Sequence, residues 1–134
     1  MLRRGRRGRR GAYAVEFALV LPVLVAFAAG MTDWGWYFAR EYEVQAAAKV
    51  CARTGASTDR DDNPVGAAQT AGQASLTEAG RDPTLGTVVA TRSGSTPGER
   101  ITCTVSQPLA PLIGLVPTMS AMRASVTMRM EDQQ

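Results

Sequence analysis

The chain has 134 residues, with no histidine, two cysteines, one lysine and a formal charge of +3. This length allows one ordinary domain, and the missing histidine excludes a serine–histidine triad and the usual zinc sites. Six of the 15 basic residues lie in the first ten positions, so the rest of the chain is slightly acidic. We therefore expect no enzyme, no catalytic residue, no metal or cofactor, and no basic face for nucleic acid.

The first segment, residues 1–11, is a basic leader with the repeat RRGRRGRRG. Such repeats are similar to arginine–glycine segments that bind RNA. Next to a membrane helix, however, clustered arginines more often fix the orientation of the helix and contact anionic lipid headgroups. We interpret the leader as a cytoplasmic topology signal.

An uncharged run of 16 residues, Phe17–Thr32, follows between Glu16 and Asp33. As a helix it spans about 25 Å, close to the hydrocarbon thickness of a bilayer. Four aromatic residues suited to a membrane–water interface stand beyond it: Trp34, Trp36, Tyr37 and Phe38. The pattern predicts one membrane-spanning helix, kinked at Pro22, with the N-terminus cytoplasmic and the C-terminus outside. The alternative is a buried helix of a soluble protein.

Two processing sites compete around this run. In the first, the arginines and Phe17–Val25 form a secretory signal peptide that is cut after Ala28, releasing a small secreted binding domain. In the second, the leader ends at Gly11, with Glu16 five residues later and Phe17 beside it. This spacing resembles the processing site of type IV prepilin-like proteins, which are cut after the glycine. The new α-amine of Ala12 would then lie one helical turn from the Glu16 carboxylate, which is costly at a membrane edge unless paired.

The helix is expected to continue beyond the membrane as a stalk. A helix over residues 13–53 is about 60 Å long, and half of that is enough to cross the bilayer. Thr54 and Gly55 are expected to end it. Helical spacing places an apolar set on one face of the stalk: Tyr37, Val44, Ala47, Ala48 and Cys51.

A small domain is predicted to pack on the stalk. Asn63 and Pro64 indicate the start of a helix that runs to Ala79, with Val65, Ala68, Leu76 and Ala79 as its apolar stripe. Period-two patterns predict strands at 87–92, 100–107 and 122–130, with a hairpin loop at 93–98. The expected fold is α+β: a long transmembrane helix extended as a stalk, packed by a short helix and a small antiparallel β-meander.

All eight aromatic residues lie between Tyr13 and Tyr42, so the core of the small domain must be built from smaller apolar side chains. Such a core buries little apolar area, and we expect the domain to need a further stabilising element. Cys51 lies on the apolar face of the stalk and Cys103 on the apolar face of the middle strand. We expect those faces to meet and the cysteines to form a disulfide, which is allowed outside the cytoplasm and would contribute about 4 kcal/mol. The alternative is two buried free thiols.

Two loops carry less specific signals. Pro108–Pro117 holds apolar residues between prolines, including Leu112, Ile113, Leu115 and Val116. These side chains either tuck under the sheet or form a contact patch for a sister subunit. The acidic loop with Asp59, Asp61 and Asp62 is interpreted as a solvated turn rather than a weak cation site.

From Arg9 to about Gly55 the sequence resembles the TadE-like family, small pilin-like proteins of tight-adherence (Flp-type) pilus assembly systems. The matching stretches are Arg10–Pro22, the aromatic-rich exit, Gln45–Ala48 and Ala52–Gly55. The resemblance implies a pilin-like fold, prepilin-peptidase processing between Gly11 and Ala12, and a role as a minor pilin or pseudopilin.

The resemblance also implies a location and partners. The location is the bacterial inner membrane, with entry into the pilus left open. The implied partners are a prepilin peptidase, the major Flp-type pilin, a sister pseudopilin, the inner-membrane assembly platform and the lipid bilayer. The resulting division is a leader at 1–11, a transmembrane and stalk helix at 12–54, and a small extracytoplasmic α+β domain at 55–134.

Overall fold

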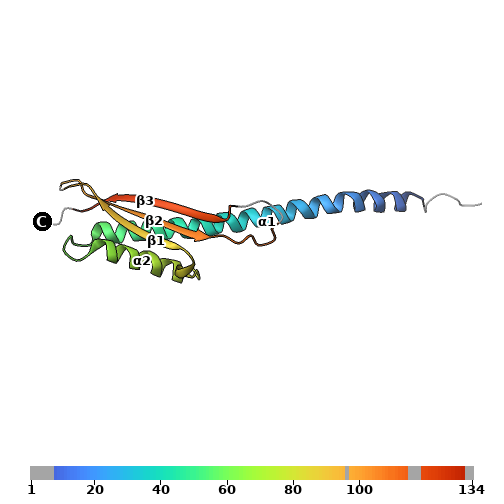
Figure 1. The fold of residues 1–134 in the computed structure, drawn as a ribbon. Helices are drawn as coiled ribbons and strands as arrows, with labels where there is room; N and C mark the ends of the chain where they lie inside the picture. Colours follow the sequence, from blue (N-terminus) through green and yellow to red (C-terminus); the bar gives the residue numbers. More distant parts are fainter. Residues whose placement is uncertain (1–7, 96, 115–118, 132–134) are drawn as a thin grey trace, which may run out of the picture.

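The computed structural model describes residues 8–95, 97–114 and 119–131. Its elements follow the expected order: α1 (Gly8–Ser57), α2 (Pro64–Glu78), a 3-10 turn η1 (Pro83–Leu85), β1 (Thr87–Ser93), β2 (Arg100–Pro108) and β3 (Ala121–Arg129). The N-terminal half of α1 projects away from the other elements, whereas its C-terminal half lies beside α2 and the sheet (Figure 1). The predicted α+β fold, a stalk helix carrying a short helix and a three-stranded sheet, is confirmed.

Helix α1 runs unbroken through Pro22 and ends at Ser57. The predicted end at Thr54–Gly55 was therefore wrong. Gly55 is buried within the helix, where a Cβ atom would lie 2.9 Å from the Cβ of Ala68 and would also collide with Ile101. The glycine thus allows α1 to approach α2 and the sheet closely, which is a packing role and not a termination role.

Helix α2 begins as its sequence predicted. The Asn63 side-chain oxygen accepts a hydrogen bond from the backbone N–H of Gly66 (3.1 Å), and Pro64 occupies the first turn. Of the expected stripe, Ala68 and Leu76 are buried, but Val65 and Ala79 are only partly covered. Gly72 was not part of the predicted stripe, but it is buried where α2 packs against β1 and the stalk. A Cβ at this position would lie 2.9 Å from Val88 Cγ1 and 3.1 Å from Cys51 Cβ.

The sheet is an antiparallel meander in the order β1-β2-β3. Its register aligns Ala90 with Cys103 and Cys103 with Val126. The side chains of Ile101, Cys103 and Val105 face inward and are fully buried, as the period-two pattern predicted. Strand β3 starts and ends one residue earlier than expected, which leaves its inward and outward faces unchanged.

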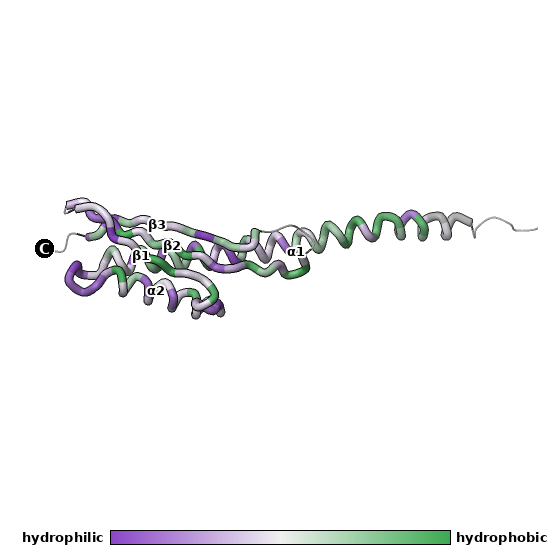
Figure 2. Tube along the Cα trace, in the orientation of Figure 1, coloured by the Kyte–Doolittle hydropathy of each residue, from purple (hydrophilic) through white to green (hydrophobic). Residues whose placement is uncertain are grey.

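The core lies between the C-terminal half of α1, α2 and the sheet. The stalk contributes mostly small side chains to it, which let both layers approach closely: Val44, Ala47, Ala48, Cys51, Ala52 and Ala56. Trp36 and Tyr37 pack partly against its edge nearest the projecting half of α1. Apolar residues without tertiary cover are concentrated in that projecting half, where the trace is mainly green (Figure 2).

Candidate functional site

The projecting half of α1 has the properties of a membrane anchor. Within the described ranges, one helix is long and apolar enough to cross a bilayer, and the apolar part of it is not buried by the rest of the chain. Large side chains such as Phe17, Leu24 and Phe27 are more than half exposed. A helix that exposes such residues needs an apolar environment, so the structure supports single-pass membrane anchoring.

The expected processing residues lie at the start of this helix. Gly11 and Glu16 are exposed, and no atom outside the local helix lies within 4 Å of the place a Gly11 Cβ would occupy. Phe17 is 61% exposed. Position 16 lies about one helical turn after position 12 in α1.

The four aromatic residues expected at the membrane interface divide into two groups. Trp34 and Phe38 are exposed at 48% and 57%, with ring centroids 5.6 Å apart. Tyr37 stacks edge-on against both rings but is partly buried by the core. Trp36 is also partly buried, and the Arg40 guanidinium lies 3.9 Å above its ring. Trp34 and Phe38 are therefore the two that face outward.

Asp33 makes a buried contact next to this site that the sequence did not identify. Its side chain is buried, with 1% of the residue exposed, and its Oδ1 accepts a hydrogen bond from the Ile113 backbone N–H at 2.8 Å. The one sequence signal was a carboxylate between an apolar run and a tryptophan, where a charge is costly without a partner.

The loop after β2 therefore returns to the end of the apolar run. Leu109 is buried, as the tucked arrangement predicted for the loop, whereas Leu112 and Ile113 are both 53% exposed. The other two residues proposed for a partner contact, Leu115 and Val116, lie outside the described residues.

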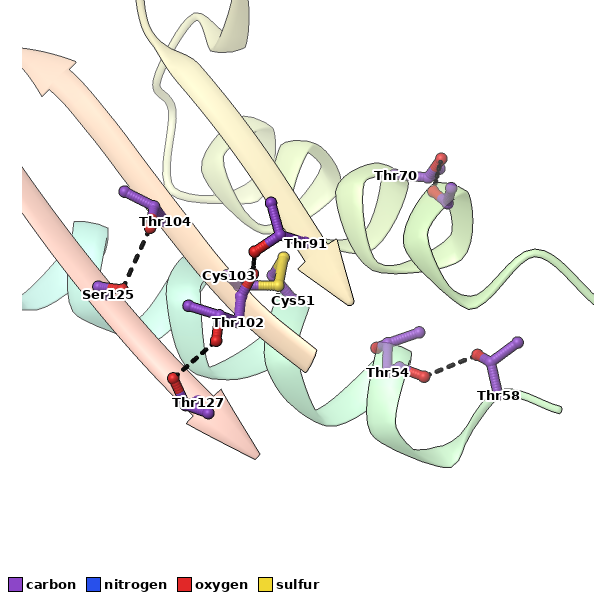
Figure 3. Close-up of a disulfide and its surroundings, with 11 residues drawn as sticks. Cys51, Thr54, Thr58, Thr70, Thr91, Thr102, Cys103, Thr104, Ser125 and Thr127 are labelled. Atoms are coloured by element: carbon purple, nitrogen blue, oxygen red, sulfur yellow. Dashed lines mark hydrogen bonds between the residues drawn. A yellow bond between two sulfur atoms is a disulfide. The ribbon is translucent and has the colours of Figure 1, made fainter. Parts of the chain in front are cut away.

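A disulfide joins Cys51 of the stalk to Cys103 of the central strand, across a Cα–Cα distance of 6.0 Å. Figure 3 shows this bond behind the sheet, and hydroxyl pairs on the outward face of the strands. Thr102 pairs with Thr127 at 2.8 Å, and Thr104 with Ser125 at 3.1 Å. The disulfide ties both layers of the domain together, because each sulfur belongs to a different layer.

An ionic cluster closes the end of the domain farthest from the projecting helix. Glu99 is buried and accepts charge-assisted hydrogen bonds from Arg92, while Arg60 Nε lies 3.2 Å from Glu99 Oε2. The hydrogen bonds from Arg92 lower the pKa of the Glu99 carboxyl, which burial alone would raise. Sequence patterns missed this cluster because its members come from separate loops and strands.

Elsewhere in the described part of the chain, metal-binding side chains are not grouped into a site. Across residues 8–95, 97–114 and 119–131, no three His, Cys, Asp or Glu side chains are grouped so that they could hold a metal ion. The acidic loop instead frames a shallow polar depression with Arg60, and Asp59, Asp61 and Asp62 are exposed there.

Comparison with known protein families finds a match that covers most of α1. Residues 11–53 match the model of the family described as TadE-like protein, which confirms the resemblance seen in the sequence. The match associates the chain with tight-adherence pilus systems, and proteins of this family are generally structural and not enzymatic. No curated protein and no solved structure matches the chain.

Proposed function

We propose that this protein is a minor pilin or pseudopilin in the assembly of a tight-adherence (Flp-type) pilus, and that it is processed after Gly11. One observation carries the proposal: the TadE-like match begins at Gly11, in the first turn of a helix that runs unbroken through an exposed apolar half into a disulfide-linked domain. The protein works by packing against other subunits and has no catalytic step of its own.

The orientation follows from charge and from the cysteines. The arginine-rich leader stays in the cytoplasm, since positive charge is retained on that side of the membrane. The domain then lies outside the inner membrane, where a disulfide persists. On this proposal residues 1–11 are removed, the rest of α1 to Ser57 forms the anchor and stalk, and the residues after it form the extracytoplasmic domain with the end of the stalk.

The anchor would exchange lipid contacts for helix contacts on assembly. An open groove lies along one face of α1, and two of its lining residues, Ala26 and Gly30, are small enough to allow another helix to approach. The groove is lined by Pro22, Val23, Ala26, Phe27, Gly30, Met31 and Trp34. The Glu16 carboxylate would pair with the new α-amine of Ala12, in the same chain or a neighbour. The partners are the major pilin, a sister pseudopilin and the assembly platform, after a prepilin peptidase has acted.

The test is intact mass and N-terminal sequencing of protein purified from its native membrane. A mature chain that begins at Ala12 is expected. A start at Ala29 would instead indicate a secreted domain released by signal peptidase, and an intact Met1 would leave an unprocessed single-pass anchor. Gly11→Leu should block the cut, whereas Gly35→Leu, at a glycine with open space around it, should leave the cut unchanged.

A further inference from the structure

The loop between β2 and β3 is held at a defined height along α1. The Ile113 backbone N–H donates to Asp33 Oδ1 at 2.8 Å, across 80 positions of sequence. Asp33 is the residue that directly follows the uncharged run Phe17–Thr32. The hydrogen bond therefore places Ile113 beside the end of the membrane-spanning segment.

Because Asp33 is buried, the uncharged exposed surface of α1 continues beyond the run 17–32. Asp33 is the one charged residue in the sequence between Glu16 and Arg40, and it is 1% exposed. The run 17–32 alone rises about 24 Å, which is shorter than a hydrocarbon core of about 30 Å. With Asp33 covered by the loop, the uncharged exterior extends to residue 39 and rises about 35 Å.

The described part of the loop exposes apolar side chains at this height. Residues 108–121 contain no charged side chain. Leu112 and Ile113 are 53% exposed, and Met119 is 68% exposed. Irregular backbone of this kind cannot lie in the hydrocarbon core, but the headgroup boundary accepts it because water and headgroups satisfy its polar groups.

We propose that residues 109–114 form a second membrane contact, in which Leu112 and Ile113 insert into the headgroup–acyl boundary of the leaflet where α1 emerges. Asp33 is the positioning residue that holds the loop at this depth. The occupant is lipid because the hydrogen bond to Asp33 places this exposed apolar surface at the end of the anchor, where α1 leaves the membrane. This inference rests on the proposed function, since it requires α1 to span a membrane.

The test uses the full chain in phosphatidylcholine–phosphatidylglycerol vesicles. A single cysteine is added at Leu112, at Leu24 in the anchor, or at Leu85 in η1, and is labelled without reductant with an environment-sensitive fluorophore. Leu85 is the matched control, because it is a leucine at 68% exposure outside the loop. Quenching is measured with aqueous iodide and with lipids that carry a quencher at shallow or deep positions.

We expect the label at 24 to be quenched by deep quenchers and the label at 112 by shallow ones. Iodide should quench the label at 112 at least threefold less than the label at 85. A shielded label at 24 with a label at 112 as open as that at 85 would overturn this inference alone. An open label at 24 would overturn the proposed membrane anchor as well. Shielding at 112 that depends on protein concentration, without quenching by lipid, would assign the loop to a second copy and overturn the lipid contact.

A pair of variants tests the positioning role of Asp33 with the label at 112. Asp33→Ala removes the acceptor, so iodide quenching at 112 should rise towards that at 85. Asp33→Asn keeps a carbonyl oxygen that can accept from the Ile113 N–H, so shielding should be retained. Equal shielding in wild type and Asp33→Ala would overturn the role of Asp33.

Discussion

At the scale of single residues, Glu99 shows how a buried charge depends on its partners. Arg92 of β1 and Arg60 of the loop after α1 both approach its carboxylate. The hydrogen bonds from Arg92, and then the charges of Arg92 and Arg60, lower its pKa below the ordinary value. A lowered pKa contributes stability that is complete above the unfolded-state pKa, about 4.3, and is lost as pH falls through the folded-state pKa.

Glu99→Gln should therefore lower the unfolding temperature at pH 7, because the arginines lose their counter-charge. The difference from wild type should shrink below about pH 4, where Glu99 itself becomes protonated. Circular dichroism of the full chain in detergent, melted across pH 2–8, measures this. Glu78→Gln, at an exposed position at the end of α2, is the control. A constant gap between Glu99→Gln and wild type at every pH would contradict the role of the charge.

At the scale of elements, two glycines of α1 have opposite surroundings. Gly55 has Ala68 and Ile101 within contact of its missing side chain, whereas nothing lies within 4 Å of that position at Gly35. Gly55→Ala should destabilise the domain by about 1–3 kcal/mol through overpacking. Gly35→Ala should be neutral or slightly stabilising, since alanine favours a helix. Denaturant unfolding of both variants measures the difference, and equal effects would remove the packing role of Gly55.

The elements themselves could be read from local sequence, but several of their contacts could not. Alternation from Met122 to Met130 and the Asn63–Pro64 cap are properties of neighbouring residues, so β3 and the start of α2 were predicted almost to the residue. Gly55 was misassigned because a glycine near a helix end has the same local pattern whether it terminates or packs. The packing role of Gly55 is set by its contact with Ile101, which is far from it in the sequence. The Asp33–Ile113 bond was missed for the same reason.

At the scale of the whole molecule, the anchor half of α1 and the domain around its other half are stabilised by different surroundings. The core cluster begins at Trp36 on α1 and includes no residue of the run 17–32. The domain depends instead on its thin core and on the disulfide, whose cysteines are separated by 52 positions. The two regions should therefore lose structure separately.

Replacing both cysteines by alanine should lower the free energy of unfolding of the domain by about 4 kcal/mol. Protection of residues 17–32 in lipid vesicles should not change, because lipid and not the domain covers them. Hydrogen exchange with mass spectrometry resolves the two regions in one sample. Faster exchange in residues 17–32 of the double variant would show that the anchor depends on the domain.

The position of the disulfide also decides how the molecule carries a mechanical load. Tension applied between the membrane end of α1 and the strands after Cys103 passes along the helix to Cys51 and then directly through the sulfur–sulfur bond. Residues 52–102, which include α2 and β1, lie in the covalent loop closed by that bond and are bypassed. A subunit pulled from its membrane side therefore cannot release residues 52–102 into the extended chain until the disulfide is reduced.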